Sequence, residues 1–218
     1  PHNPVGRVFD ADELRRLADF AARHDLLVCS DEIHCGLVLD ADRSHRPLAA
    51  LDEATARRTI TLMAPSKTWN IPALYCAFAI IPDPALRRRY VHAMRGVVPH
   101  VNVLGMVAAE AAYRDGDAWR QALLDYLRGN RERVLAAVAA MPGLSATRPE
   151  ATYLAWIDCR EMMAARDVAD PVAFFEAAGV GLSDGAVFGA PGFVRLNFGC
   201  PRATLDAALA RMAHALGA

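Results

Sequence analysis

Residues 10–32 read DADELRRLADFAARHDLLVCSDE, in which a helical pattern is followed at once by a short apolar run. Across residues 10–24 the apolar side chains recur at helical spacing after an Asp-rich start, which predicts an amphipathic helix with a capped N-terminus. The run at residues 26–29 is short and ends in Ser-Asp-Glu, as a buried parallel strand does. The stretch therefore predicts one helix–strand unit of an α/β fold.

The strand pattern returns twice further along the chain. Residues 59–63 read TITLM before Ala-Pro-Ser-Lys, and residues 76–81 predict a third strand. In an α/β sheet, ligands bind at the carboxyl ends of the strands. Asp31 and Lys67 each follow a predicted strand, so we expect both at a ligand-binding edge.

Helical patterns dominate after residue 84. Residues 101–114 are apolar enough to predict a buried helix, and residues 117–141 predict a long amphipathic one. The patterns beyond them predict a strand at 152–158, a helix at 171–178, short strands near Val180 and Val194, and a closing helix at 203–216.

This order of elements predicts an α/β chain with a boundary near residue 116. We expect residues 1–115 to form part of a large domain, with a mainly parallel sheet and flanking helices. Residues 116–218 are expected to form a small C-terminal α+β domain.

Composition narrows the function classes. The 218 residues carry a formal net charge of −1 and no basic block, which argues against a nucleic-acid partner, and no apolar run approaches the length of a membrane span. The five cysteines form neither CxxC pairs nor an even disulfide framework, which favours a reducing cytoplasm. The chain opens inside a proline-rich turn without an initiator methionine, so we expect it to be part of a larger protein.

Lys67 is the only lysine among 24 basic residues, and all the others are arginine. Lysine can lose its proton and form an imine, whereas arginine cannot. No other charged residue lies between Arg58 and Asp83. Such an apolar setting disfavours the ammonium form and supplies a neutral amine for attack on an aldehyde, although a lysine that merely extends from a strand end to solvent is the alternative.

Three further residues are candidates for ligand contacts. Asp31, as a buried carboxylate, could hold the protonated ring nitrogen of a cofactor; a helix cap or metal ligand is the alternative, but no His/Cys/Asp cluster at ligand spacing supports a metal site. Asn3 stands in a Pro- and Gly-rich turn that either aims its amide at a ligand or is only a turn. Arg195 interrupts an apolar strand and needs an anion, either a substrate carboxylate or a structural acid.

Taken together, three segments resemble motifs of the fold-type I pyridoxal-phosphate (PLP) enzymes, specifically the class I/II aminotransferases. They are PHNPVG at residues 1–6, SDEIH at residues 30–34 and SKT at residues 66–68. The resemblance runs from the first residue to the last. It implies that Asn3 binds the phenolic oxygen of PLP, that Asp31 supports the ring and that Lys67 is the Schiff-base lysine.

Within this family, the segments SDEIH, APSKTWN and RLNFGCPR look most like the cystathionine β-lyase-like C–S lyases, the branch that includes the maltose-regulon modulator. His34 stands where many relatives have tyrosine, Tyr75 where they have the arginine that binds the cofactor phosphate, and Ala64 where they have serine. The resemblance therefore gives phosphate binding to Ser66 and to segments before residue 1. It makes Asn3, Asp31, His34, Ser66 and Lys67 the cofactor-binding set.

The function that this resemblance implies is a PLP-dependent enzyme acting on L-amino acids as a cytoplasmic homodimer. Arg195 falls where the family places the arginine that grips the substrate α-carboxylate. We expect β-elimination that releases a thiol, pyruvate and ammonia, with transamination as the alternative. A non-catalytic regulatory or binding module on the same fold is a third possibility, against which the intact Lys67 and Asp31 argue.

Overall fold

A computed structural model describes all residues from 1 to 218. Its helices are α1 (Ala11–Arg23), α2 (Glu53–Arg57), α3 (Pro84–Met94), α4 (Val103–Asp115), α5 (Asp117–Ala140), α6 (Arg160–Arg166), α7 (Pro171–Ala177) and α8 (Arg202–Ala215), with 3₁₀ helices η1 (Leu48–Ala50), η2 (Pro72–Leu74) and η3 (Gly185–Phe188). Its strands are β1 (Val28–Asp31), β2 (Thr59–Met63), β3 (Phe78–Ile80), β4 (Ser145–Ala146), β5 (Leu154–Asp158), β6 (Ser183–Asp184) and β7 (Phe193–Asn197).

The chain divides into two compact units, each with its own sheet. Unit 1 consists of Pro1, Val8–Gly36 and Ser44–Ala122, and unit 2 consists of His2–Arg7, Leu37–Arg43 and Leu123–Ala218. Two short segments from the first part of the chain thus belong to unit 2. The assignment of residues 1–115 and 116–218 to a large and a small domain stays a prediction.

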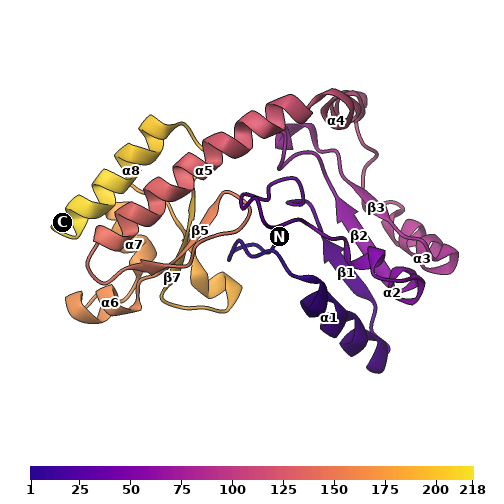
Figure 1. Ribbon diagram of the computed structural model, residues 1–218, viewed down its shortest axis with the longest axis horizontal. Helices are drawn as coiled ribbons and strands as arrows, with labels where there is room; N and C mark the ends of the chain where they lie inside the picture. Colours follow the sequence, from indigo (N-terminus) through magenta and orange to yellow (C-terminus); the bar gives the residue numbers. More distant parts are fainter. The chain divides into compact units, whose positions relative to one another are not determined.

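The sheet of unit 1 has three strands in the order β1-β2-β3 (Figure 1). β1 and β2 are parallel, with Val28 opposite Thr59 and Asp31 opposite Leu62. β3 runs antiparallel to β2, so the sheet is mixed and the prediction of a mainly parallel sheet is wrong for this strand. The reason lies in the connection between β2 and β3, which holds turns and η2 but no crossover helix of the kind that usually returns a parallel strand.

α1 confirms the first predicted helix. Asp10 and Glu13 form a capping box, in which the Glu13 amide donates to Asp10 Oδ1 at 2.8 Å and the Asp10 amide donates to Glu13 Oε2 at 3.0 Å. Leu14 and Ala18 on its buried face pack with Leu48 of η1.

Two predictions of burial are wrong. β1 begins only at Val28, and the Leu26 and Leu27 side chains before it are about half exposed. α4 was expected to be buried, but four of its large apolar side chains are more than half exposed: Val103, Leu104, Met106 and Val107. Its packed face is formed instead by the small residues Gly105, Ala109 and Ala112.

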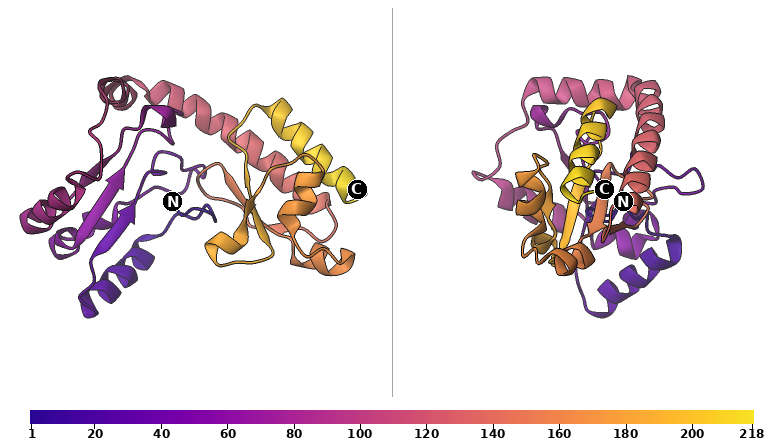
Figure 2. Two further views of the ribbon diagram at one scale, coloured as in Figure 1. Left: turned by 180° about the vertical axis from the view of Figure 1, so that it is seen from behind. Right: turned by 90° about the vertical axis from the view of Figure 1, so that its left-hand side faces the viewer.

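Unit 2 contains a four-stranded antiparallel sheet in the order β4-β5-β7-β6. α5 and α8 run side by side within this unit, as Figures 1 and 2 show. β5, α5, α7 and α8 confirm the predicted strand and helices to within two residues. β4 and α6 were not predicted, and the two residues of β4 are too few for a periodic pattern.

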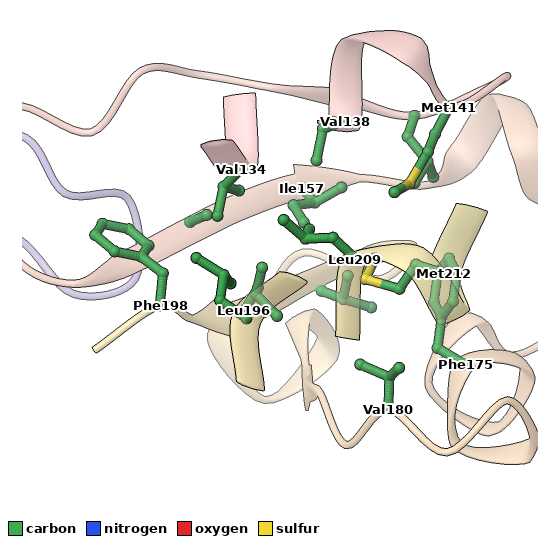
Figure 3. Close-up of a cluster of buried hydrophobic side chains, with 14 of the residues drawn as sticks. Val134, Val138, Met141, Ile157, Phe175, Val180, Leu196, Phe198, Leu209 and Met212 are labelled. Carbon is green, nitrogen blue, oxygen red and sulfur yellow. The ribbon is translucent and has the colours of Figure 1, made fainter. Parts of the chain in front are cut away.

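The main core of unit 2 joins helices α5, α7 and α8 to strands β5 and β7 (Figure 3). Ile157, Phe175, Phe198 and Met212 are fully buried in it. Every helix of the unit therefore contributes an apolar face to one sheet, which fixes β7 and its Arg195 in place. No helix of the chain is both long enough and apolar enough to span a membrane.

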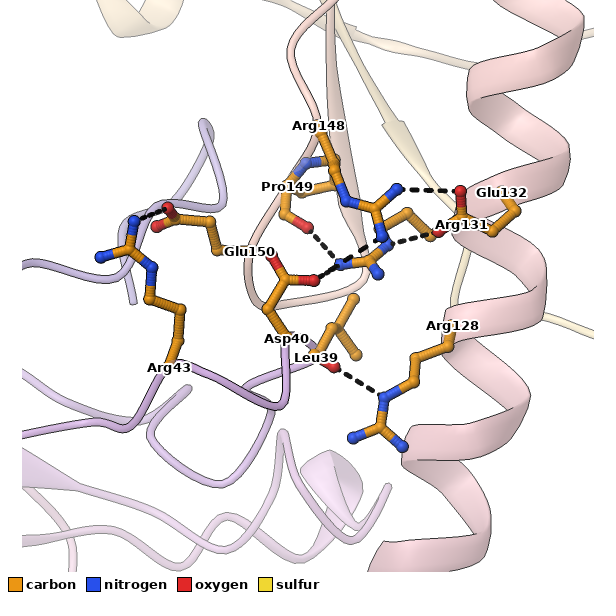
Figure 4. A network of polar contacts seen from close by, with 9 residues as sticks. All are labelled: Leu39, Asp40, Arg43, Arg128, Arg131, Glu132, Arg148, Pro149 and Glu150. Carbon is orange, nitrogen blue, oxygen red and sulfur yellow. Dashed lines mark hydrogen bonds and ion pairs between the residues drawn. The ribbon is translucent and has the colours of Figure 1, made fainter.

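A buried arginine ties three distant segments of unit 2 together (Figure 4). Arg131 of α5, 3% exposed, donates from Nη1 to Asp40 Oδ1 at 2.6 Å and to the Pro149 carbonyl at 2.9 Å. One turn earlier, Arg128 donates to the Leu39 carbonyl at 2.6 Å. Both arginines therefore anchor the segment Leu37–Arg43 to α5.

Replacing Arg131 by methionine should lower the free energy of unfolding by about 3 kcal/mol, because it leaves the Asp40 carboxylate and the Pro149 carbonyl without their buried donor. Arg133→Met is a matched control on the same helix, since its ion pair with Asp206 is about half exposed and should be worth under ~1 kcal/mol. Urea titrations measure both values. Equal losses would show that Arg131 does not brace unit 2.

Candidate functional site

Asp31 and Lys67 lie at the same edge of the unit 1 sheet. Asp31 is the last residue of β1, and Lys67 stands in the turn that follows β2, the parallel neighbour of β1. The carboxyl ends of parallel strands meet at one edge, so the predicted placement of both residues is confirmed. The Asp31 carboxylate is exposed and accepts one hydrogen bond, from the Ile33 amide at 3.3 Å, so the expected burial of this group is wrong for this chain.

The turn that carries Ser66 and Lys67 is closed by backbone hydrogen bonds. The Trp69 amide donates to the Pro65 carbonyl at 2.9 Å, and the Ile71 amide donates to the Ser66 carbonyl at 3.2 Å. The Trp69 indole donates to the Gly116 carbonyl at 2.9 Å, which ties the turn to the end of α4. Lys67 itself is half-buried, and its amine makes no ion pair within unit 1.

The turns after β1 and β2 pack tightly against each other through Gly36 and Thr68. A Cβ added to Gly36 would lie 2.6 Å from Thr68 Oγ1 and 2.7 Å from its methyl carbon, closer than side chains approach. Thr68 is 2% exposed. Glycine is thus required at position 36 for the loop after β1 to approach the loop that carries Lys67, a role that the sequence analysis missed.

The buried side chain of Glu32 holds the loop after β1 in place. Its buried carboxylate accepts hydrogen bonds from Ser30 Oγ at 2.9 Å and from the Leu48 amide at 3.1 Å, and it pairs with His45 Nε2 at 2.8 Å. Burial alone would raise the pKa of Glu32, but the hydrogen bonds from His45 and Ser30 outweigh it and hold that pKa below its ordinary value. Glu32 therefore has a structural role, and His34, two residues further along the loop, is also buried.

In unit 2, the turn at residues 2–7 carries Asn3. The Gly6 amide donates to the His2 carbonyl at 2.7 Å, and the Asn3–Pro4 peptide bond is cis. Gly6 has φ +76°, and a Cβ there would lie 2.5 Å from that of Pro149. Only glycine fits this position, so the turn packs directly on the loop that Arg131 holds.

Arg195 of β7 meets this turn. Its Nη1 donates to Asn3 Oδ1 at 2.8 Å, its Nη2 donates to Ser183 Oγ at 3.0 Å, and its Cζ lies 5.0 Å from the centre of the Phe188 ring. No carboxylate of unit 2 pairs with it. The structure therefore brings together two of the predicted site residues, Asn3 and Arg195, and adds two that the sequence analysis missed, Ser183 and Phe188.

These motifs agree with a comparison to known protein families. Residues 1–212 match the family described as "Aminotransferase class I and II". The chain belongs to this family. Among curated relatives, it is 38% identical to the protein MalY of Escherichia coli K12, covering 100% of this chain and 56% of MalY. It is 35% identical to the cystathionine β-lyase of Corynebacterium glutamicum, covering 99% of this chain and 58% of that enzyme.

Solved structures that resemble this chain include members of the same group of enzymes. The crystal structure of a protein named OvoB superposes with a TM-score of 0.95 at 52% identity, covering 99% of this chain and 56% of that one. A PLP-bound C–S lyase from Staphylococcus hominis matches with a TM-score of 0.90 at 33% identity, over the same shares. The chain thus spans little more than half the length of the relatives that it matches.

The lowered pKa of Glu32 predicts a pH-dependent contribution to stability. A carboxyl group whose pKa is lower in the folded than in the unfolded protein stabilises the fold at pH values above its ordinary pKa of 4.5. This stabilisation is lost as the pH falls through the pKa that the group has in the folded protein. Glu32→Gln should therefore lower the free energy of unfolding by about 1–3 kcal/mol at pH 7 and by less at pH 4. Glu53→Gln, which alters an exposed pair with Arg57, is the control and should show little change at either pH. A loss for Glu32→Gln that is the same at both pH values would contradict the pKa assignment.

Proposed function

We propose that this protein is a PLP-dependent C–S β-lyase that releases a thiol, pyruvate and ammonia from an L-amino acid. The observation that carries the proposal is the placement of the only lysine, Lys67, beside the end of β1, where Asp31 lies. Relatives named cystathionine β-lyase and C–S lyase, each over 30% identical along the whole chain, support the same activity.

The residues at this edge fit PLP by their chemistry. Lys67 would hold the cofactor aldehyde through Nζ, Asp31 would accept a hydrogen bond from the ring nitrogen and keep it protonated, and Ser66 would donate to the phosphate. His34 would line the cofactor from the loop after β1. For Asn3, which belongs to unit 2, the contact with the phenolic oxygen rests on the family motif alone. The close packing of Gly36 on Thr68 supports this fit, because it holds the loops of Asp31 and Lys67 at one edge. When bound, PLP supplies an electron sink that stabilises negative charge on the substrate α-carbon.

The chain's own residues would then divide the reaction between them. Arg195 would bind the substrate α-carboxylate, which fixes the orientation of the α-carbon. Lys67 Nζ would remove the α-proton as the general base. The sulfur substituent would then leave the β-carbon and take up a proton to become the thiol, and water would hydrolyse the released enamine to pyruvate and ammonia.

Transamination is the alternative, and the family match favours it as well. It would need the same α-proton removal by Lys67, but the amino group would pass to an oxo-acid acceptor and no thiol would leave. We propose in addition that the protein acts in the cytoplasm as a homodimer, and that residues 1–115 belong to the large and residues 116–218 to the small domain of the family fold.

Incubation of the purified, PLP-loaded protein with L-cystathionine separates these reactions. The lyase proposal predicts pyruvate, ammonia and homocysteine in equal amounts without any added oxo-acid. An oxo-acid product that forms only when an amino acceptor is present would establish the transaminase instead. No turnover in either assay, together with an absorbance spectrum that PLP leaves unchanged, would favour a non-catalytic binding module.

A further inference from the structure

The surroundings of Arg195 differ from those of a structural arginine. Its two hydrogen-bond acceptors, Asn3 Oδ1 and Ser183 Oγ, are neutral, and the third neighbour is the apolar ring of Phe188. A half-buried guanidinium without a carboxylate partner keeps its full charge for an incoming anion.

Arg160 provides a direct comparison in the same unit. It stacks on Phe193 at 4.9 Å, nearly the distance at which Arg195 stacks on Phe188. The positive charge of Arg160, however, is paired with the Asp158 carboxylate, which accepts hydrogen bonds from Nη2 at 2.6 Å and from Nε at 3.0 Å. The two arginines thus share an aromatic support, but only Arg160 is neutralised.

We propose that Ser183 and Phe188 are positioning residues that orient the Arg195 guanidinium for a substrate carboxylate without neutralising it. An acidic side chain in place of Ser183 would compete with the substrate carboxylate for the Arg195 guanidinium. A hydroxyl group and an aromatic ring instead restrict rotation of the guanidinium and leave its positive charge free to bind the substrate. This inference rests on the proposed function, because it takes the carboxylate of an amino acid as the anion.

The fold holds both positioning residues firmly. Ser183 lies opposite Arg195 in the β6–β7 ladder, so strand pairing sets the distance between them. Phe188 is the last residue of η3. Asp184 caps this helix, because its side chain accepts a hydrogen bond from the Ala186 amide at 2.9 Å. A Cβ on Gly185 would lie 2.4 Å from the Phe193 carbonyl oxygen, so the turn is packed directly on β7.

A buried tryptophan, Trp156, also contacts the Phe188 ring. Trp156 meets Phe188 edge-on, with centroids 5.7 Å apart and planes at 90°, and stacks on Phe193 at 5.3 Å. Trp156 is 9% exposed and lies opposite Arg195 in the β5–β7 ladder. The Phe188 ring therefore contacts two side chains that are cross-strand neighbours, Trp156 and Arg195.

The test compares two inhibitors of the PLP-loaded protein that differ only in charge: 3-(methylthio)propionate and its amide. Phe188→Leu and Ser183→Ala should each raise the inhibition constant of the carboxylate about tenfold and that of the amide less than about twofold. KM for L-cystathionine should rise more than kcat falls. Phe188→Tyr and Ser183→Thr should restore carboxylate binding to within about twofold, because they keep the ring and the hydroxyl.

Two further variants separate the possible failures. Tyr126→Leu removes the ring under Arg202, whose Cζ lies 4.5 Å from the ring centre, and should leave the ratio of the two inhibition constants unchanged. Arg195→Lys should weaken carboxylate binding at least as much as the positioning variants do. If only Arg195→Lys weakens binding of the carboxylate inhibitor, Ser183 and Phe188 are not positioning residues, but Arg195 still binds the carboxylate. If Arg195→Lys also leaves that binding unchanged, the positioning roles and the carboxylate-binding role of Arg195 are all wrong. A loss of lyase products with the carboxylate effects intact would overturn the proposed reaction alone.

Discussion

The parallel pairing of β1 with β2 is the constraint on which the candidate cofactor site depends. Because Asp31 lies opposite Leu62, β1 ends where β2 is about to enter the turn that carries Lys67. A shift of one residue in this register would exchange the two faces of β1 and turn Asp31 away. The buried Glu32 carboxylate ties the end of β1 to the following segment by bonding Ser30, His45 and the Leu48 amide. The chemistry at the edge thus depends on a buried carboxylate that takes no part in it.

Unit 2 arranges its candidate residues by a different device. Asn3 and Arg195 are far apart in sequence, and they meet because the turn at residues 2–7 packs on the loop that contains Pro149. Arg131 holds that loop through its bond to the Pro149 carbonyl. The absence of a Cβ at Gly6 permits the contact, and the antiparallel ladder of β6 and β7 supplies Ser183. Backbone packing therefore fixes the orientation of a guanidinium whose charge the unit leaves uncompensated.

The sequence was sufficient for those features that depend on local pattern or on motif. Lys67 stood out as the only lysine, α1 was predicted by its periodicity and its acidic cap, and Asp31 by its place after an apolar run. The direction of β3 was not predictable from its own residues, because parallel and antiparallel strands of such length share the same composition. The exposed face of α4 was missed since its apolar residues surround the helix and the packed side is selected by three small ones. Ser183 and Phe188 gave no signal at all, as their roles arise from strand register and a 3₁₀ turn.

The central claim is that Lys67 is the amine that holds the cofactor aldehyde. Borohydride reduction of the PLP-loaded protein, followed by proteolysis and peptide mapping, measures this directly, because reduction makes the link permanent. The proposed site predicts one pyridoxyl group, on the peptide that contains Lys67, and none after Lys67→Arg. A pyridoxyl group found on any other amine of the protein, or labelling that persists in Lys67→Arg, would contradict the account.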